Sequence, residues 1–229
     1  MDPDQQSRRL ASESLAGDDP TGWFERLYVA AEEGAAVVPW DRGAPNRLLV
    51  EWAEARAVAG GGQRALVVGS GLGDDAEYIA ALGFDTVAFD IATTAVRIAR
   101  RRFAGSLVDY RVADLLEPPR EWREAFDLVV ESITVQALPP ALHAEATARV
   151  SEMVAAGGTL LVISGGRDEN DGPVEGPPWP LTRAELDAFA SGDLQPVRIE
   201  TLGAAGERRW RAEFRRPAGA SSHAPAGRG

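Results

Sequence analysis

The 229-residue chain contains no cysteine and no lysine, because all 24 residues of the Lys+Arg total are arginines. Without thiols the sequence excludes disulfides, thiolate-built zinc or iron–sulfur sites and a cysteine nucleophile. Without a lysine amine it excludes Schiff-base chemistry and the lysine of a P-loop. Only two histidines, His143 and His223, are present. A histidine-rich metal site or a Ser-His-Asp triad would rest on His143 alone, and we expect no metal site.

Positive charge and long apolar runs are also scarce. Acidic residues outnumber basic ones 35 to 24, which gives a formal net charge of -11. Such a surface repels phosphate backbones and anionic lipid heads, so neither nucleic acid nor a membrane is an expected partner. The first residues are polar, and no run approaches the roughly 18 apolar residues of a membrane span. These features predict a soluble, cytoplasmic protein and give no indication of its oligomeric state.

The composition, 45% hydrophobic and 26% charged, predicts one globular domain. Residues 1–20 show almost no apolar periodicity, and residues 217–229 are of low complexity. Neither segment has enough apolar surface to order itself, so both are expected to be disordered. The domain is therefore expected to span residues 21–216, with a helical cover at its N-terminal end.

Short apolar runs of strand length alternate with longer runs of helical period. Runs that are apolar on both faces are typical of a parallel sheet. The predicted strands are 65–68, 86–89, 107–112, 127–130, 159–163, 197–202 and 209–214, and the predicted helices are 75–82, 94–103, 140–154 and 182–189. Repeated β-α-β order followed by a terminal hairpin predicts a doubly wound, Rossmann-like α/β fold with helices on both faces of the sheet.

Three further segments lie outside this alternation. Apolar residues at helical spacing around Trp23 and Trp52 predict two amphipathic helices over an edge of the sheet. Residues 165–180 are rich in Gly, Pro and acids and predict a long irregular loop, a kind of segment that often binds ligands. Trp179 in this loop could fold over a substrate or simply anchor the loop.

The most specific local pattern is Gly69-Ser70-Gly71-Leu72-Gly73, between the predicted strand 65–68 and the predicted helix 75–82. Glycines allow a tight turn and close approach of a ligand, and loops at the carboxyl ends of parallel strands bind ligands. A dinucleotide site has glycine at the sixth position of this pattern, where this chain has Asp74 followed by Asp75. Two carboxylates at a helix N-terminus repel a pyrophosphate. The pattern therefore favours S-adenosylmethionine, which carries no phosphate.

Acidic residues follow the next three predicted strands. Asp90 lies 17 residues beyond Gly73, where a carboxylate can accept hydrogen bonds from both ribose hydroxyls. Asp114 can accept from an adenine amino group, and Glu131 is expected beside the methionine part of the cofactor. Any one of these acids could be a helix N-cap. Three of them after a glycine loop together predict an adenosine-type ligand.

In these residues the chain resembles the class I S-adenosylmethionine-dependent methyltransferases, over about residues 22–214. More narrowly, it is similar to the thiopurine methyltransferase group, which includes plant halide and thiol methyltransferases. The similarity rests on Gly22-Trp23, Val38-Pro39-Trp40-Asp41-Arg42-Gly43, Phe89-Asp90-Ile91, Phe126-Asp127-Leu128 and Gly176-Pro177-Pro178. The resemblance implies a seven-stranded, mostly parallel sheet with an antiparallel last strand and a cofactor covered by N-terminal helices.

The resemblance also implies which residues bind the cofactor. By position these are Trp23, Trp40, Gly69, Asp90, Asp114, Leu115 and Glu131, to which the glycine loop adds Gly71 and Gly73. The plant enzymes have a second tryptophan where this chain has Leu27, and aromatic residues where it has 132–136. Those positions line the acceptor side in the family, so the resemblance does not extend to a halide or thiopurine acceptor.

The scarcity of strong bases bears on the acceptor. In a direct displacement at a sulfonium methyl group the protein contributes mainly positioning and desolvation. A thiol of pKa about 8.5 is a few per cent thiolate near neutral pH and needs no dedicated base. We therefore expect methyl transfer to a small thiol. Trp40 would flank the reacting methyl group and Asp41 would orient or deprotonate the acceptor, although Asp41 could equally pair with Arg42 or Arg47.

Three alternatives stay open. An O- or N-methyltransferase of small-molecule biosynthesis would need a base from Asp41, Glu131 or His143, and His143 is expected to be an exposed or half-buried surface residue instead. A nucleotide-dependent oxidoreductase shares the fold. A non-catalytic protein that binds an adenosine ligand would share the pocket but transfer nothing.

Overall fold

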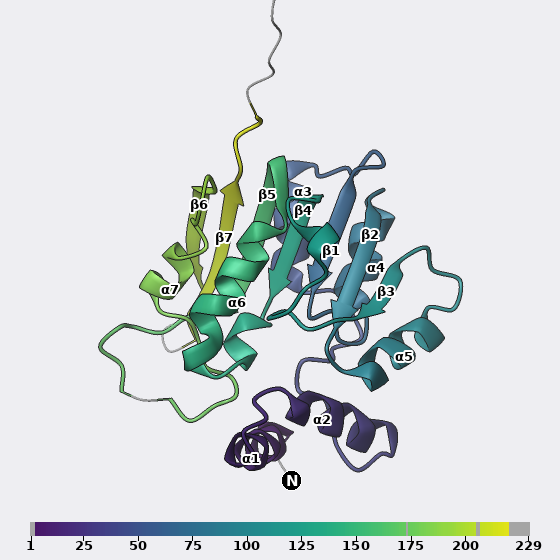
Figure 1. Ribbon diagram of the computed structural model, residues 1–229, viewed down its shortest axis with the longest axis vertical. Helices are drawn as coiled ribbons and strands as arrows, with labels where there is room; N and C mark the ends of the chain where they lie inside the picture. The colour runs from purple at the N-terminus through teal and green to yellow at the C-terminus, as the bar shows by residue number, and fades with distance from the viewer. Residues whose placement is uncertain (1–2, 173, 205–206, 220–229) are drawn as a thin grey trace, which may run out of the picture.

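Seven strands form one mixed sheet in the order β3-β2-β1-β4-β5-β7-β6 (Figure 1). The structure is a computed structural model that describes residues 3–172, 174–204 and 207–219. The strands are β1 (Arg64–Val68), β2 (Asp85–Asp90), β3 (Asp109–Val112), β4 (Phe126–Ser132), β5 (Val154–Gly165), β6 (Gln195–Leu202) and β7 (Arg209–Arg215). Strands β1 to β5 are parallel, and β7 runs antiparallel between β5 and β6. The predicted fold, including the antiparallel last strand, is confirmed.

Each strand differs from its predicted bounds by one or more residues, and the starts of β3 and β5 show why. Strand β3 begins at Asp109, where its pairing with β2 begins, and the preceding Leu107 is 94% exposed. Strand β5 begins at Val154, which pairs with Phe126 at the start of β4, so the helix expected over 140–154 ends at Glu152. In both cases the boundary is set by pairing with a neighbouring strand whose residues lie far away in the sequence.

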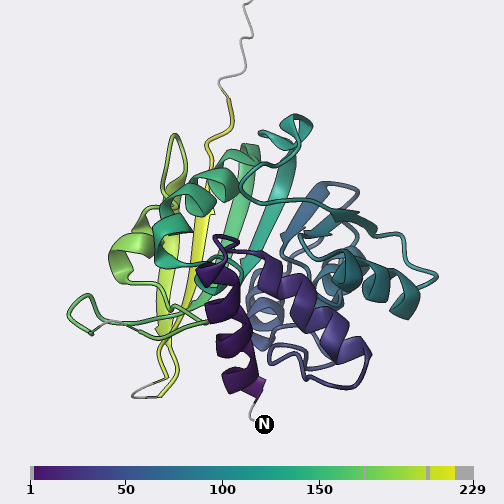
Figure 2. The ribbon, with the colours of Figure 1, turned by 60° about the horizontal axis from the view of Figure 1, so that its bottom comes forward.

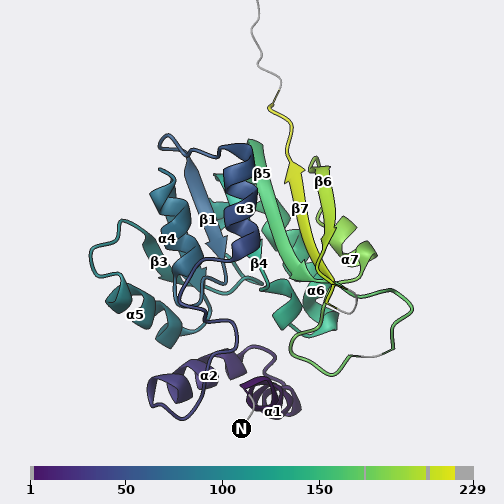
Figure 3. The same cartoon turned by 180° about the vertical axis from the view of Figure 1, so that it is seen from behind.

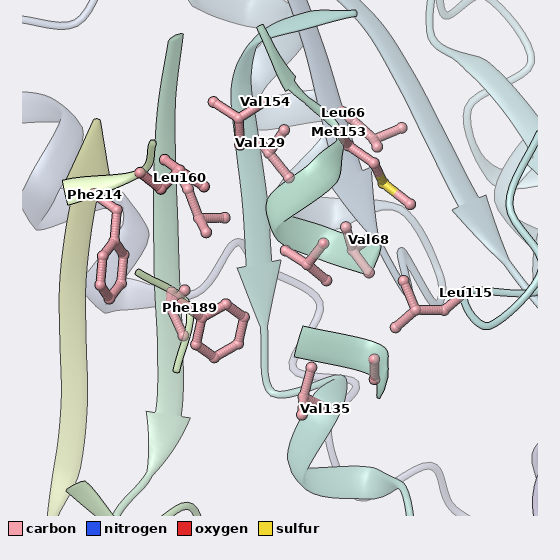
Figure 4. Packing of buried hydrophobic residues seen from close by; sticks show 14 of the residues in the cluster. Leu66, Val68, Leu115, Val129, Val135, Met153, Val154, Leu160, Phe189 and Phe214 are labelled. Carbon is pink, nitrogen blue, oxygen red and sulfur yellow. The ribbon is translucent and has the colours of Figure 1, made fainter. Parts of the chain in front are cut away.

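Helices cover both faces of the sheet (Figures 1 and 3). On one face lie α3 (Arg47–Arg56), α4 (Asp74–Ala81) and α5 (Thr93–Arg102), and on the other lie α6 (Pro140–Glu152), α7 (Arg183–Asp187) and the 3-10 helices η1 (Arg120–Trp122) and η2 (Val135–Ala137). Alternate residues of each strand serve the two cores: Leu66 and Val68 pack on the α6 side (Figure 4), and Ala65 and Val67 on the α3 side. Helix α3 was expected over an edge of the sheet. Instead its residue Leu49 packs against one face of the sheet.

The N-terminal part of the chain lies across the edge at which the parallel strands end (Figures 1 and 2). It contains α1 (Pro3–Ala16) and α2 (Gly22–Glu32), and we call residues 3–46 the N-terminal cover. The expectation that residues 1–20 are disordered is wrong for the residues in α1. Leu10 and Ala11 are buried against Trp23 and Leu27 of α2, so α2 supplies the apolar surface that the segment lacks by itself.

The expected long loop connects β5 to α7. Residues 166–180, apart from the undescribed residue 173, contain no helix and only an isolated bridge from Gly166 to Leu181. The Trp179 N–H donates to the Gln136 carbonyl over 2.7 Å, which anchors the loop to η2. Most of the expected tail, residues 220–229 with His223, lies outside the described residues. Within the part of the chain that the structure describes, no helix is both long enough and apolar enough to cross a membrane.

Candidate functional site

The glycine loop leaves β1 at the carboxyl edge of the sheet, directly beneath the N-terminal cover. Gly69, Gly71 and Gly73 have φ values of 58°, 52° and 100°, in the region that favours glycine. A Cβ on Gly71 would lie 3.0 Å from the Tyr28 hydroxyl and 3.6 Å from Trp40 Nε1. The Tyr28 and Trp40 side chains of the cover therefore pack against Gly71. Of the three glycines predicted to bind the cofactor, only Gly69 lines the pocket described below.

Asp90, the last residue of β2, is 7% exposed. Its Oδ2 accepts from the Gly71 N–H and its Oδ1 from the Ala92 N–H, both over 2.9 Å. Burial raises the pKa of Asp90 to about 6, and these backbone hydrogen bonds offset the rise only in part. Each carboxylate oxygen can accept a second hydrogen bond, so Asp90 can still hold two hydroxyl groups of a ligand.

The segment after β3 continues the wall begun by Asp90. The Asp114 carboxylate accepts from the Leu116 N–H over 2.8 Å, and the neighbouring Leu115 is buried. Both residues line the same pocket as Asp90. Of the three acids expected around an adenosine ligand, Asp90 and Asp114 thus line one pocket.

These segments and the cover line a partly open pocket with about 660 Å³ of space, a volume that includes the solvent at its mouth. Its lining is mostly apolar and comes from the cover, the glycine loop and the segments that follow β2, β3 and β4. The lining residues are Thr21, Phe24, Tyr28, Trp40, Gly69, Phe89, Asp90, Ile91, Ala113, Asp114, Leu115, Leu116, Ser132, Ile133, Thr134, Ala137 and Leu138. The pocket is thus built at the topological switch point between β1 and β4, where open α/β sheets bind ligands.

The cover contributes an aromatic wall. Trp40 donates its indole N–H to the Tyr28 hydroxyl over 2.9 Å, and the two rings meet edge to face with centroids 6.1 Å apart. Trp23 is fully buried behind this wall, stacked on Phe24 at 4.0 Å, and is not among the lining residues. The sequence thus predicts the position of Trp40, whereas Trp23 supports the wall from behind.

Glu131 ends β4 beneath the pocket and is fully buried. Its Oε1 accepts from the Thr134 and Val135 N–H groups, and its Oε2 has no hydrogen-bond partner. Burial raises the pKa of Glu131 to about 7. The residue holds the start of η2, which bears lining residues, but does not itself line the pocket.

Both acids at the start of α4 accept hydrogen bonds from other parts of the chain. Asp74 accepts two hydrogen bonds from the Arg102 guanidinium, and Asp75 accepts from the Asn46 N–H. Burial raises the pKa of both carboxyls. Two acids in the first turn of α4 leave no place for the pyrophosphate of a dinucleotide.

Two candidate bases lie away from the pocket. Asp41 is exposed, lies 3.7 Å from Arg102 rather than beside Arg42 or Arg47, and is not a lining residue. His143 was expected at the surface but is 3% exposed, with Nδ1 2.8 Å from Glu185 and Nε2 2.9 Å from the Leu138 carbonyl. A buried position between two acceptors makes His143 a link between α6 and α7.

Three residues of the cover line the pocket although the sequence did not indicate them: Thr21, Phe24 and Tyr28. Phe24 and Tyr28 are four residues apart, which places them on the same side of α2. That spacing also fits core packing, and the sequence does not show which surface the helix meets.

Residues 65–158 match the family model described as "Methyltransferase domain". No curated protein sequence matches the chain. Among solved structures, one described by the conversion of a disulfide bond into a thioacetal group during echinomycin biosynthesis superposes with a TM-score of 0.68 and 22% identity, covering 87% of this chain and 95% of that one.

Two other solved structures show the range of proteins with this fold. A 1,6-didemethyltoxoflavin-N1-methyltransferase from Burkholderia thailandensis, with S-adenosylhomocysteine bound, has a TM-score of 0.63 and 17% identity over 85% of this chain and 87% of that one. The 4+2 cyclase SpnF has a TM-score of 0.64 and 18% identity over 76% and 81%. At these identities the similarity establishes the Rossmann-like fold. Residues 65–158, less than half of the chain, are similar to the methyltransferase-domain model.

Proposed function

We propose that this protein is an S-adenosylmethionine-dependent methyltransferase whose acceptor is a small thiol. The observation that carries the cofactor is the hydrogen bond from the Gly71 N–H to Asp90, beside a pocket that Asp90 and Gly69 line. Asp90 can still accept hydrogen bonds from a ribose, and Asp114 can still accept one from an adenine. Asp74 and Asp75 disfavour a phosphate at the start of α4. The residues present therefore fit an adenosine ligand without phosphates.

The chain's own residues would divide the binding as follows. Asp90 would hold the sugar, Asp114 and Leu115 the base, and the loop from Gly69 to Gly73 would approach the cofactor backbone-first. The Trp40 ring would face the sulfonium, which an aromatic face attracts. When bound, S-adenosylmethionine would supply an electrophilic methyl group. The pocket lining would hold the acceptor sulfur against that methyl group and exclude water, and the thiol proton would pass to solvent.

The thiol acceptor is supported by the side chains that face the pocket. Its lining contains no lysine, arginine or histidine, and its acids are Asp90 and Asp114. Tyr28 is a poor base as well, because burial and the charge of Asp90 raise its pKa well above 10. An alcohol would need a base that this wall does not offer, whereas a thiol ionises readily near neutral pH.

Two further features support the finer assignment. The structure whose description names a disulfide-to-thioacetal conversion concerns sulfur chemistry on this fold. The Pro39-Trp40-Asp41 element and the Gly22-Trp23 pair resemble the thiopurine, halide and thiol methyltransferase group. We place the protein with that group, with Trp40 at the pocket. Asp41 is not used as a base here, because it is exposed and lies close to Arg102.

Calorimetric titration with S-adenosylhomocysteine and with NADH tests the cofactor. We expect binding of S-adenosylhomocysteine and none of NADH, since the start of α4 carries two carboxylates. Tight binding of NADH alone would support the oxidoreductase alternative and refute the proposal.

A methyl-transfer assay tests the reaction. Labelled S-adenosylmethionine is incubated with the protein and with small thiols, matched alcohols, matched amines or iodide. We expect methylated thiol as the main product. Methylation of the alcohols or amines alone would overturn the thiol assignment but keep methyl transfer. Cofactor binding with no methylated product would favour a non-catalytic role or another reaction. A 4+2 cyclase has this fold, so the fold by itself does not imply methyl transfer.

A further inference from the structure

The hydroxyl group of Tyr28 has an unused hydrogen. Tyr28 is 1% exposed, and its oxygen accepts the indole N–H of Trp40 over 2.9 Å. Among the described residues no oxygen or nitrogen accepts the hydrogen that the phenol itself carries. Because Trp40 occupies one side of the oxygen, the O–H bond must point elsewhere, and buried hydroxyl groups normally find a partner.

The surroundings of Tyr28 show where that partner would lie. The hydroxyl oxygen packs against Gly71, since a Cβ at that position would lie 3.0 Å from it. The Gly71 N–H in turn donates to Asp90. Burial, and after it the negative charge of Asp90, raise the pKa of Tyr28 well above 10, so the phenol remains a donor. Tyr28 and Asp90 line the same pocket but make no hydrogen bond to each other.

We propose that Tyr28 donates its hydrogen to a ribose hydroxyl oxygen of the adenosine ligand, which in turn donates to Asp90. A hydroxyl is the group that both accepts and donates, as this pair requires. An ammonium group could not accept from Tyr28, and a carboxylate or phosphate would be repelled by Asp90. The inference rests on the proposed function, because it assumes a ligand that contains ribose.

The test compares two tyrosine variants with three ligands. Tyr28→Phe removes only the hydroxyl, and Tyr78→Phe makes the same change on α4, outside the pocket. Calorimetry measures the affinity of each protein for S-adenosylhomocysteine and for its 2′-deoxy and 3′-deoxy analogues. We expect Tyr28→Phe to weaken S-adenosylhomocysteine about 10-fold, the usual effect of one lost hydrogen bond. For the analogue that lacks the contacted oxygen the loss should be below about 2-fold.

The outcomes separate this inference from the proposed function. An equal loss for all three ligands would mean that Tyr28 acts only by supporting Trp40, and no loss would mean no contact; either result overturns the inference. Failure of the wild-type protein to bind any of the three ligands would overturn the proposed function together with it. Tyr78→Phe should behave as the wild-type protein.

A second variant keeps the inference testable if Tyr28→Phe does not fold. Trp40→Phe removes the N–H that orients the Tyr28 hydroxyl but leaves the hydroxyl in place. We expect a loss of several-fold for S-adenosylhomocysteine and a smaller loss for the same deoxy analogue. Equal losses for all three ligands in this variant would contradict the proposed contact.

Discussion

Two buried carboxyl groups, Asp90 in β2 and Glu131 in β4, lie near the carboxyl edge of the sheet. Burial raises the pKa of Asp90 to about 6 and that of Glu131 to about 7. In the unfolded chain both ionise near pH 4. The folded protein therefore binds more protons than the unfolded chain between these limits, and its stability falls as the pH rises through them.

Replacing Glu131 tests this linkage. The wild-type free energy of unfolding should decrease between pH 4.5 and 8, and the Glu131 share of that decrease is about 3 kcal/mol for a shift of this size. Glu131→Gln keeps the oxygen that accepts from Thr134 and Val135 and cannot ionise. Urea unfolding at several pH values should therefore give a flatter profile for Glu131→Gln.

The exposed Glu121 provides the control for this measurement. Glu121→Gln should reproduce the wild-type profile within error. A Glu131→Gln profile parallel to that of the wild-type protein would show that Glu131 ionises equally easily in the folded and unfolded states.

Ionisation of Asp90 should strengthen ligand binding, although it lowers the stability of the folded protein. Its ionised form is the better acceptor for ribose hydroxyls, so affinity for S-adenosylhomocysteine should increase from pH 5 to pH 7, through its pKa of about 6. Asp90→Asn should weaken binding at pH 7 by about 10- to 100-fold, the value of a charge-assisted hydrogen bond. It should also abolish this part of the pH dependence. Unchanged affinity in calorimetry at pH 7 would remove Asp90 from the site.

At the scale of elements, α2 and α5 are joined by an unusual cap. Helix α5 has no side-chain cap from its own N-cap residue, Ala92. Instead, the Glu25 carboxylate of α2 accepts from the Thr94 N–H over 3.0 Å and from the Thr94 hydroxyl over 2.7 Å. One residue thus satisfies the start of α5 and fixes the helix that carries Phe24 and Tyr28.

Glu25→Ala should therefore affect both stability and ligand binding. Loss of a helix cap costs about 1–2 kcal/mol of unfolding free energy, and a displaced α2 should weaken S-adenosylhomocysteine several-fold. Chemical unfolding and calorimetry measure the two effects. Glu54→Ala, on the exposed side of α3, is the matched control and should change neither. Lost stability with unchanged affinity would show that the cap does not position the pocket wall.

The link between α6 and α7 should behave differently. His143 joins Glu185, whose other oxygen accepts from the Thr182 N–H in a capping box. His143→Ala leaves a cavity and unpaired buried groups, so we expect a loss of about 2–4 kcal/mol of unfolding free energy. Affinity for S-adenosylhomocysteine, measured under conditions where the variant is folded, should remain unchanged. A large loss of affinity would instead place His143 in the functional site.

The sequence predicts those parts of the molecule that depend on local pattern. The apolar runs of β1 and β4 and the turn at Gly69 to Gly73 require nothing beyond their own residues, and Asp90 and Asp114 follow from where such strands end. Helix α1 was missed because its order depends on burial against α2. Asp41 was overestimated for the same reason, since only the fold shows that Arg102 lies beside it.

On the scale of the whole molecule, the pocket is closed by two parts that are not continuous in sequence. The sheet supplies Asp90, Asp114 and Thr134, whereas the cover supplies Phe24 and Tyr28. A ligand of nucleoside size held between them is in contact with both. Because such a ligand bridges the two parts, bound ligand should oppose separation of the cover from the sheet.

Amide hydrogen exchange followed by mass spectrometry measures this coupling. If the α2 amides exchange by separation of the cover, ligand at 100 times its dissociation constant stabilises the closed form by about 2.7 kcal/mol, or roughly 100-fold in exchange rate. Saturating S-adenosylhomocysteine should therefore slow exchange in Gly22–Glu32 far more than in Pro140–Glu152 of α6, which contributes no residue to the pocket lining. Equal slowing in both helices would indicate only global stabilisation, and the ligand would then not join the cover to the sheet.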